Sequence, residues 1–234
     1  MTNALSNLTS LPSSKVNRTD LAKRYAASSF LKRAQVVSSG KLVNEKGIKP
    51  GNWAIPVSDD EVTDLGNSID VLVIAVRDKA LDTNEKPPVA AYDPEGDLYK
   101  QIEERAAEKN SGCMYGPSFL VYERSSGQFL EIFFGNASGR QEAGNLADFL
   151  PVSEADAKAL GPKFKAQGPQ AATLSTKYIK RPKFSWWAPV VGKCSTPFKE
   201  LPETEEFVKQ ATKFINQKDE GPEVDEKADE GRSR

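Results

Sequence analysis

The residues best suited to binding chemistry lie in one stretch, residues 162–199, which contains eight Lys or Arg residues and no Asp or Glu. In its densest part, cations alternate with aromatic side chains: Lys177, Tyr178, Lys180, Arg181, Lys183, Phe184, Trp186 and Trp187. Cations neutralise the phosphates of a polyanion, and aromatic rings stack on unpaired bases. The combination therefore predicts a surface that binds single-stranded nucleic acid without reading its sequence.

Catalytic and metal sites are disfavoured by the residue types present. The chain has no histidine, which excludes Ser-His-Asp and Cys-His catalysis and His-ligated zinc. Four carboxylates at positions 59, 60, 61 and 64 have the ligand chemistry of a cation site. A second converging cluster is missing, so a solvated turn is the favoured interpretation. We expect no enzymatic activity, no metal and no cofactor.

A glycine-containing segment, residues 135–140, lies between a predicted strand and a predicted helix, as phosphate-binding loops do. It lacks the Gly-Lys-Ser/Thr ending of a P-loop and the third glycine of the dinucleotide fingerprint. We interpret it as a connector, with Arg140 as a candidate contact to a nucleic-acid backbone.

Cysteine content and hydropathy bear on the compartment. Cys113 and Cys194 are far apart in the sequence and have no metal-type spacing, so two reduced thiols are favoured over a disulfide. The N-terminal residues lack the charged-then-apolar order of a signal peptide, and no apolar run reaches the roughly 20 residues of a membrane helix. These features predict a cytoplasmic protein without a membrane partner.

Charge is strongly segregated along the chain although the net charge is only −1. Residues 1–50 carry +7, residues 51–161 carry −11, residues 162–199 carry +8 and residues 200–234 carry −5. Such partitioning indicates separate tasks for the segments. The composition predicts a flexible arm over residues 1–18, one domain over residues 19–218, and an acidic, disordered tail over residues 219–234.

Hydrophobic periodicity and turn residues predict an α+β domain of mainly antiparallel strands with a few peripheral helices. Residues 69–76 are the most hydrophobic run and predict a central strand. Helices are predicted over residues 19–28, 95–109, 141–150, 153–160 and 204–216. Further strands are predicted over residues 30–37, 52–56, 89–92, 118–122 and 128–134, the last two forming a hairpin.

Two points stay open at the level of sequence. Pro182 interrupts the basic segment, so residues 172–191 form either a hairpin or one bent edge strand. Trp186 and Trp187 either stack on bases or anchor the core, in which case the neighbouring lysines protect a sheet edge. Phe129 and Phe133 alternate with Glu131 and share its face of a strand, where a core role is favoured over base stacking.

The layout of short strands, basic aromatic segment and acidic tail resembles single-stranded DNA-binding proteins of tailed bacteriophages. Residues 111–122 and 184–189 also resemble stretches in phage proteins. The resemblance implies an OB-like small barrel, a role in phage DNA replication or recombination in the host cytoplasm, and replication proteins as partners of the tail. Single-stranded DNA is the implied ligand, with RNA as an alternative. This tail ends in Arg234, whereas tails of that family often end in an aromatic residue, so docking through the tail tip is not implied.

A different class of function also fits the composition. A virion structural protein or an assembly adaptor would use the same aromatic residues as an interface, and its terminal arms would become ordered on assembly.

Overall fold

The computed structural model describes residues 31–57, 61–85, 88–163, 165–183, 185–199 and 201–218. The predicted arm, the predicted helix over residues 19–28 and the predicted tail lie outside these ranges. The strands are β1 (Lys32–Val36), β2 (Trp53–Pro56), β3 (Val62–Gly66), β4 (Ser68–Asp82), β5 (Val89–Ala91), β6 (Cys113–Glu123), β7 (Gln128–Phe133), β8 (Gln170–Lys180) and β9 (Ser185–Lys193). The helices are α2 (Lys41–Asn44), α3 (Asp97–Arg105), α4 (Ala137–Ala147), α5 (Glu154–Leu160) and α6 (Thr204–Ile215).

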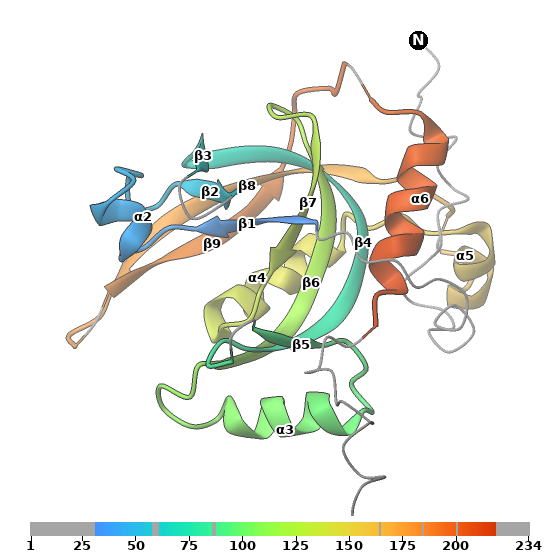
Figure 1. Cartoon of the computed structure of the whole chain (residues 1–234). Coiled ribbons are helices and arrows are strands. Elements are labelled where there is room, and N and C mark those ends of the chain that lie inside the picture. The colour runs from blue at the N-terminus through green and yellow to red at the C-terminus, as the bar shows by residue number, and fades with distance from the viewer. Residues whose placement is uncertain are drawn as a thin grey trace, which may run out of the picture.

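The strands form one large sheet in the order β3-β2-β1-β7-β6-β4-β8-β9, with β5 paired to β4 (Figure 1). Most pairings are antiparallel, whereas β1 and β7 run parallel. The predicted mixture of helices and mainly antiparallel strands is confirmed. The hydrogen-bonded strand order is open at β3 and β9, so the described strands do not close into the small barrel that the resemblance implies.

Strand β4 is an interior strand of the sheet, as its hydrophobic run predicts. It pairs with β6 on one side and with β8 on the other, with an irregularity in the β6 register between Val73 and Ala75. Val71, Leu72, Val73 and Ile74 are fully buried. The strand continues past the predicted end at Val76 to Asp82, and residues of β7 and α3 neutralise the charges of Arg77, Lys79 and Asp82.

Helices cover both faces of the sheet. On one face, Phe207, Ala211 and Phe214 of α6 pack against Leu72 and Ile74 of β4, and Figure 1 shows α6 lying across this face. The helix predicted over residues 204–216 is therefore confirmed, and its apolar residues Phe207, Ala211 and Phe214 are buried. On the other face, a second core cluster joins β1 and β2 to β4, β6, β7 and β8 together with α4. Helix α3 packs on β5 and the adjoining ends of β4 and β6.

Some element boundaries differ from the sequence predictions. Helix α4 begins inside the glycine-containing connector, because the Asn136 side chain accepts a hydrogen bond from Gly139 N and so caps the helix there. Asp64 lies in strand β3 rather than in a turn, and its carboxylate accepts hydrogen bonds from the Asn52 amide. Helix α5 begins one residue after the predicted start at Ser153, because the Ser153 side chain caps it. Among the described helices, none has the length and apolar character needed to cross a membrane.

Candidate nucleic-acid interface

The basic aromatic segment forms a β-hairpin, so the bent single strand is excluded. Strands β8 and β9 pair without interruption from Ala172 opposite Lys193 to Lys180 opposite Ser185. The connection, residues 181–184, contains Pro182, which has no backbone N–H and a fixed φ and therefore suits a turn better than a central strand. Figure 1 shows this hairpin extending away from the body of the molecule.

The distal part of the hairpin projects beyond the sheet. Strand β8 pairs with β4 only from Gln170 to Ser175, where its partner is Ser68. Beyond Ser175, the described pairings of β8 are with β9 alone. The predicted cations of this distal part are all exposed: Lys177, Lys180, Arg181 and Lys183. The structure thus brings the four together on a short two-stranded ribbon.

Among the described residues of the ribbon, Tyr178 is the exposed aromatic one. Its side chain keeps 54% of its accessible surface, and its hydroxyl donates to Ser185 Oγ at 2.7 Å. Its ring lies 5.2 Å from the Trp187 ring, at an interplanar angle of 51°. Trp187 is half-buried and supports the tyrosine from across the hairpin. Tyr178 is therefore held in one orientation with an open ring surface, as stacking on a base requires.

The two tryptophans are neither sealed in the core nor fully open. Trp187 lies against the turn between β1 and β2, where a Cβ on Gly51 would lie 2.7 Å from a ring atom. The Trp186 indole N–H donates to Ser138 Oγ at 3.2 Å, which joins β9 to the start of α4. Each indole thus fixes the hairpin to a neighbouring segment. Phe184 lies outside the described residues.

Arg140 has a role within the fold. Its guanidinium Nη1 donates to the backbone carbonyls of Tyr115 and Gly135, both at 2.9 Å, and its guanidinium carbon lies 4.5 Å from the centre of the Tyr115 ring. These contacts tie α4 to β6 and engage the side chain that the sequence suggested for a nucleic-acid backbone.

Sequence reasoning missed the segments that hold the hairpin. Thr176 Oγ1 donates to the Gly51 carbonyl at 2.6 Å, and Gly51 N donates to the Val37 carbonyl at 2.7 Å. Gly51 has a φ of +91°, a backbone conformation that favours glycine. The Lys49-Pro50-Gly51 sequence marks a turn, but nothing local to it indicates that this turn lies on Trp187.

A second concentration of charged side chains is buried under α6. Glu131 of β7 accepts hydrogen bonds from Lys79 Nζ at 2.9 Å and from Ser118 Oγ at 2.6 Å, and Arg77 Nη2 lies 3.4 Å away. All four residues are at most 6% exposed. Burial alone raises the pKa of Glu131, but the charges of Lys79 and Arg77 and the Ser118 hydroxyl outweigh it and lower that pKa. Glu131 is therefore an ionised carboxylate at neutral pH.

Arg77 also joins the cluster to α6. Its Nη1 donates to the Phe214 carbonyl at 2.6 Å, in the last turn of the helix, and its Nη2 donates to Gln217 Oε1. The guanidinium lies between the rings of Tyr92 and Phe214, 3.8 and 4.1 Å from their centres. A cation at a helix C-terminus is favourable. The buried charged residues of β4 thus join this strand to β7 and α6. They expose no group that could react with or bind a ligand.

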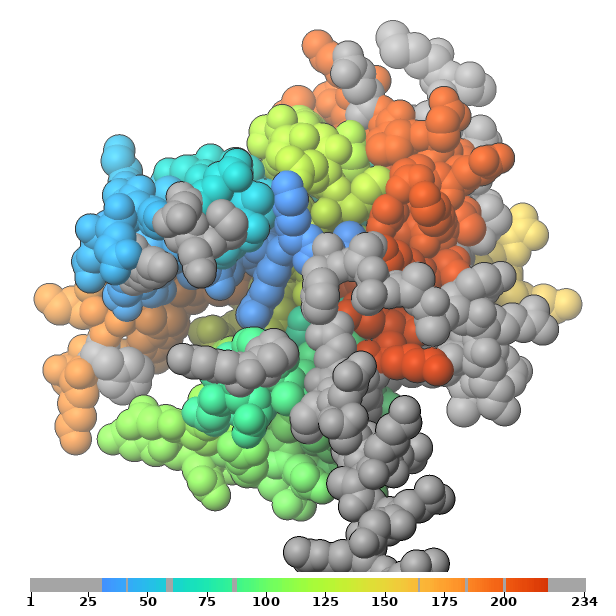
Figure 2. All heavy atoms as spheres, in the orientation of Figure 1, coloured from blue at the N-terminus to red at the C-terminus, as the bar shows by residue number. Residues whose placement is uncertain are grey.

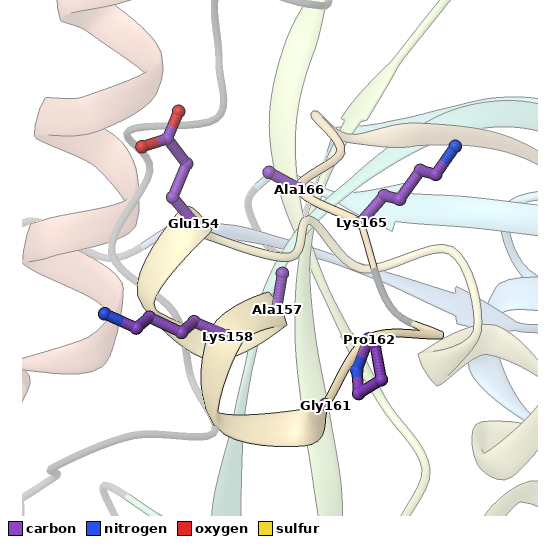
Figure 3. A pocket seen from close by; sticks show the side chains of 7 residues that line it. All are labelled: Glu154, Ala157, Lys158, Gly161, Pro162, Lys165 and Ala166. Atoms are coloured by element: carbon purple, nitrogen blue, oxygen red, sulfur yellow. The ribbon is translucent and has the colours of Figure 1, made fainter.

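A shallow hollow of about 470 Å³ lies beside α5 (Figure 3). Figure 3 shows Ala157 and Ala166 lying between charged side chains that point outward from the hollow, those of Glu154, Lys158 and Lys165. The lining contains no group of side chains suited to catalysis. Among the described residues, no three His, Cys, Asp or Glu side chains converge as metal ligands would.

The hairpin is accordingly the surface whose composition and exposure best suit a ligand. No protein-family model matches the chain, and comparisons with curated proteins and with solved structures found no significant match.

Proposed function

We propose that this chain binds single-stranded nucleic acid without sequence preference, and that the distal part of hairpin β8–β9 is its binding element. The observation that carries the proposal is an oriented, exposed Tyr178 ring on a projecting ribbon with four exposed cations. The cations would neutralise phosphates and the ring would stack on a base. Every base has a stacking surface, so little discrimination between sequences is expected.

Single-stranded DNA is the ligand we propose, with RNA as an alternative, and the role is support of phage DNA replication or recombination. We also propose that the fold is OB-like. The support for it is a contact between strands that are distant in the strand order: the turn between β1 and β2 contacts β8 and β9 through Gly51. OB-folds bind single strands in a groove on a curved sheet.

The acidic segment over residues 219–234 would regulate the same surface. It has seven acids and three bases, whereas residues 162–199 have eight cations and no acid. A tethered acidic segment competes with a nucleic acid for the same cations. The tail would also be the contact for replication proteins.

The test is fluorescence anisotropy of a labelled oligothymidine titrated with the full chain at several salt concentrations. Each phosphate contact made by a hairpin cation steepens the fall of log K against log salt by about 0.7, so contacts by all four cations would set a limit of about −3 for the slope. A variant with Lys177, Lys180, Arg181 and Lys183 all changed to Gln should lose most of this binding. The matched control changes four exposed lysines away from the hairpin to Gln, so that net charge falls equally: Lys100, Lys109, Lys158 and Lys209.

The control variant should bind as the unsubstituted chain does, because the four lysines it loses lie away from the proposed binding surface. Equal losses in both variants would mean that attraction is general and the hairpin is not the site. Duplex DNA and RNA of equal length serve as competing ligands. No binding to any of the three, together with concentration-dependent oligomers in sedimentation, would replace the proposal with an assembly role.

A further inference from the structure

The two faces of the distal hairpin differ in chemistry. Directly opposed residues of an antiparallel pair share a face, and successive residues alternate between faces. Tyr178 opposes Trp187, and Lys180 opposes Ser185, so these four residues lie on one face. The hydrogen bond from the Tyr178 hydroxyl to Ser185 agrees with this assignment. We call this the Tyr178 face.

The opposite face carries a different set. Lys177 opposes Ala188, and Ile179 opposes Trp186. Ala188 is buried, and the Trp186 indole donates to Ser138 of α4. Trp186, the described aromatic residue of this face, therefore anchors the hairpin, and Lys177 is an exposed cation on the same face. The aromatic and basic residues that the sequence groups into one site are divided between two faces.

The Tyr178 face is preorganised by the turn between β1 and β2. Thr176 shares the face, two residues before Tyr178, and donates to the Gly51 carbonyl, while Trp187 lies against Gly51 itself. This turn also carries Lys49, which is exposed. Figure 2 shows the blue atoms of the α2 region beside the orange atoms of the hairpin. Lys49 is thus an exposed cation two positions before Gly51, the residue that contacts Thr176 and Trp187 of the Tyr178 face.

We infer that the nucleic acid is bound on the Tyr178 face alone, an inference that rests on the proposed function. One unpaired base stacks on Tyr178, and the phosphates on its two sides contact Lys180 and Lys49. Trp187 is a positioning residue, because it holds the tyrosine ring and is itself half-covered by Gly51. Tyr178 is the exposed aromatic ring of the described part of this face, so one base stacks on it, and a base paired within a duplex is excluded from the site.

The matched pair Lys180→Gln and Lys177→Gln tests the choice of face. The two lysines are exposed, lie on the same strand and differ in the face they occupy. Lys180→Gln should reduce the steepness of the salt dependence on oligothymidine by about 0.7, the loss of one phosphate contact on a single strand. Lys177→Gln should leave the slope unchanged. Equal changes in both variants would overturn the face assignment and leave the proposed function standing.

Tyr178 supplies the second test. Tyr178→Ala should weaken oligothymidine binding about 5- to 150-fold through the loss of stacking, whereas Tyr178→Phe should stay close to the unsubstituted chain. Quenching of tryptophan fluorescence by oligothymidine should survive in the Phe variant and fall in the Ala variant. If Tyr178→Ala binds as tightly as Tyr178→Phe, the stacking role is wrong. If the unsubstituted chain binds no single strand, both this inference and the proposed function fail.

Discussion

At the level of single residues, Glu131 balances the charge of two cations beneath α6. Lys79 and Arg77 are 6% exposed, and Glu131 is the acidic partner that the structure gives to both. A buried cation without a counter-charge costs several kcal/mol, and so removal of one partner from a buried ion pair is strongly destabilising. The Glu131 carboxylate is therefore needed for Arg77 and Lys79 of β4 to stay buried.

Glu131→Gln should lower the free energy of unfolding by about 3–5 kcal/mol, because it leaves Lys79 and Arg77 buried without a negative charge. Urea unfolding of the two proteins measures the difference. The control is Glu104→Gln on the exposed side of α3, which should change stability by less than about 0.5 kcal/mol. A Glu131 variant as stable as that control would show that the ion pairs add nothing.

The pH dependence of this difference follows from the lowered pKa of Glu131, which ion pairing and hydrogen bonding produce against the effect of burial. A carboxyl group whose pKa is lower in the folded chain than in the unfolded chain stabilises the fold at pH values above its unfolded pKa, about 4.3. That contribution is lost as the pH falls through the lower, folded-state pKa. The stability gap between the unsubstituted chain and Glu131→Gln should therefore narrow below about pH 4.

At the level of elements, the turn between β1 and β2 and the hairpin β8–β9 form one unit through Gly51. Two requirements meet at this position. The backbone has a φ of +91°, and a Cβ would lie 2.7 to 2.9 Å from three atoms of the Trp187 ring. Gly47, in the same loop, has a φ of +69° with nothing within 4 Å of a Cβ. Both glycines have a positive φ, and only Gly51 of the two lies against the Trp187 ring.

Gly51→Ala should destabilise the protein more than Gly47→Ala does. Both variants place a side chain at positive φ, at about 1–2 kcal/mol, and Gly51→Ala adds about 1–3 kcal/mol for overpacking against Trp187. Urea unfolding gives the stabilities, and tryptophan fluorescence reports the displaced indole. Equal losses, with unchanged fluorescence in both, would show that Trp187 moves aside freely and does not fix the Tyr178 ring.

The elements also show which parts of the structure follow from local sequence. The alternating apolar residues of β6 and β7, the β-branched run of β4 and the apolar stripe of α6 each carry their own periodicity, and these elements were predicted. The sequence does not predict that β4 continues beyond Val76, because the charged residues Arg77 and Lys79 are typical of a chain that leaves the core. Their partner Glu131 lies more than fifty positions away, and only its place between Phe129 and Phe133 hinted at a buried carboxylate.

In the candidate site, too, some features follow from local sequence and others depend on contacts between distant segments. The hairpin and its exposed cations lie where the composition suggested, since charge and Pro182 are local signals. The division of the aromatic residues between two faces depends on the register of β8 with β9, and the support of Trp187 depends on a turn more than a hundred positions earlier. Contacts of this kind arise from the global packing of the sheet and leave no periodic pattern in the chain.

At the level of the whole molecule, opposite charges are carried by segments at different places in the chain. Helix α6 is joined to the sheet through Arg77, and residues 219–234 follow soon after it with seven acids. Removing residues 219–234 should raise the affinity for oligothymidine by roughly tenfold at low salt, with the gain vanishing as salt screens the competition. Anisotropy titrations at 50 mM and about 500 mM salt measure it.

A tail of the same length with a scrambled order of the same residues is the matched control, and it should behave as the natural tail does. Unchanged or weaker binding after removal of the tail would contradict its role as a competitor. A scrambled tail that acts like the deletion would instead point to a specific contact with the hairpin.

The parallel pairing of β1 with β7 has a consequence for how the molecule is made. Lys32 lies beside Leu130, so β1 and its antiparallel partner β2 can join the rest of the sheet only once β7 has been synthesised. Ribosomes deliver the N-terminal part first, and pairings between distant segments close slowly because of the chain entropy they restrict. The turn that carries Gly51 meets Trp187 later still, once β9 has emerged. The scaffold around β4 and β6 therefore forms before the two halves of the binding face come together, and that face is completed near the end of folding.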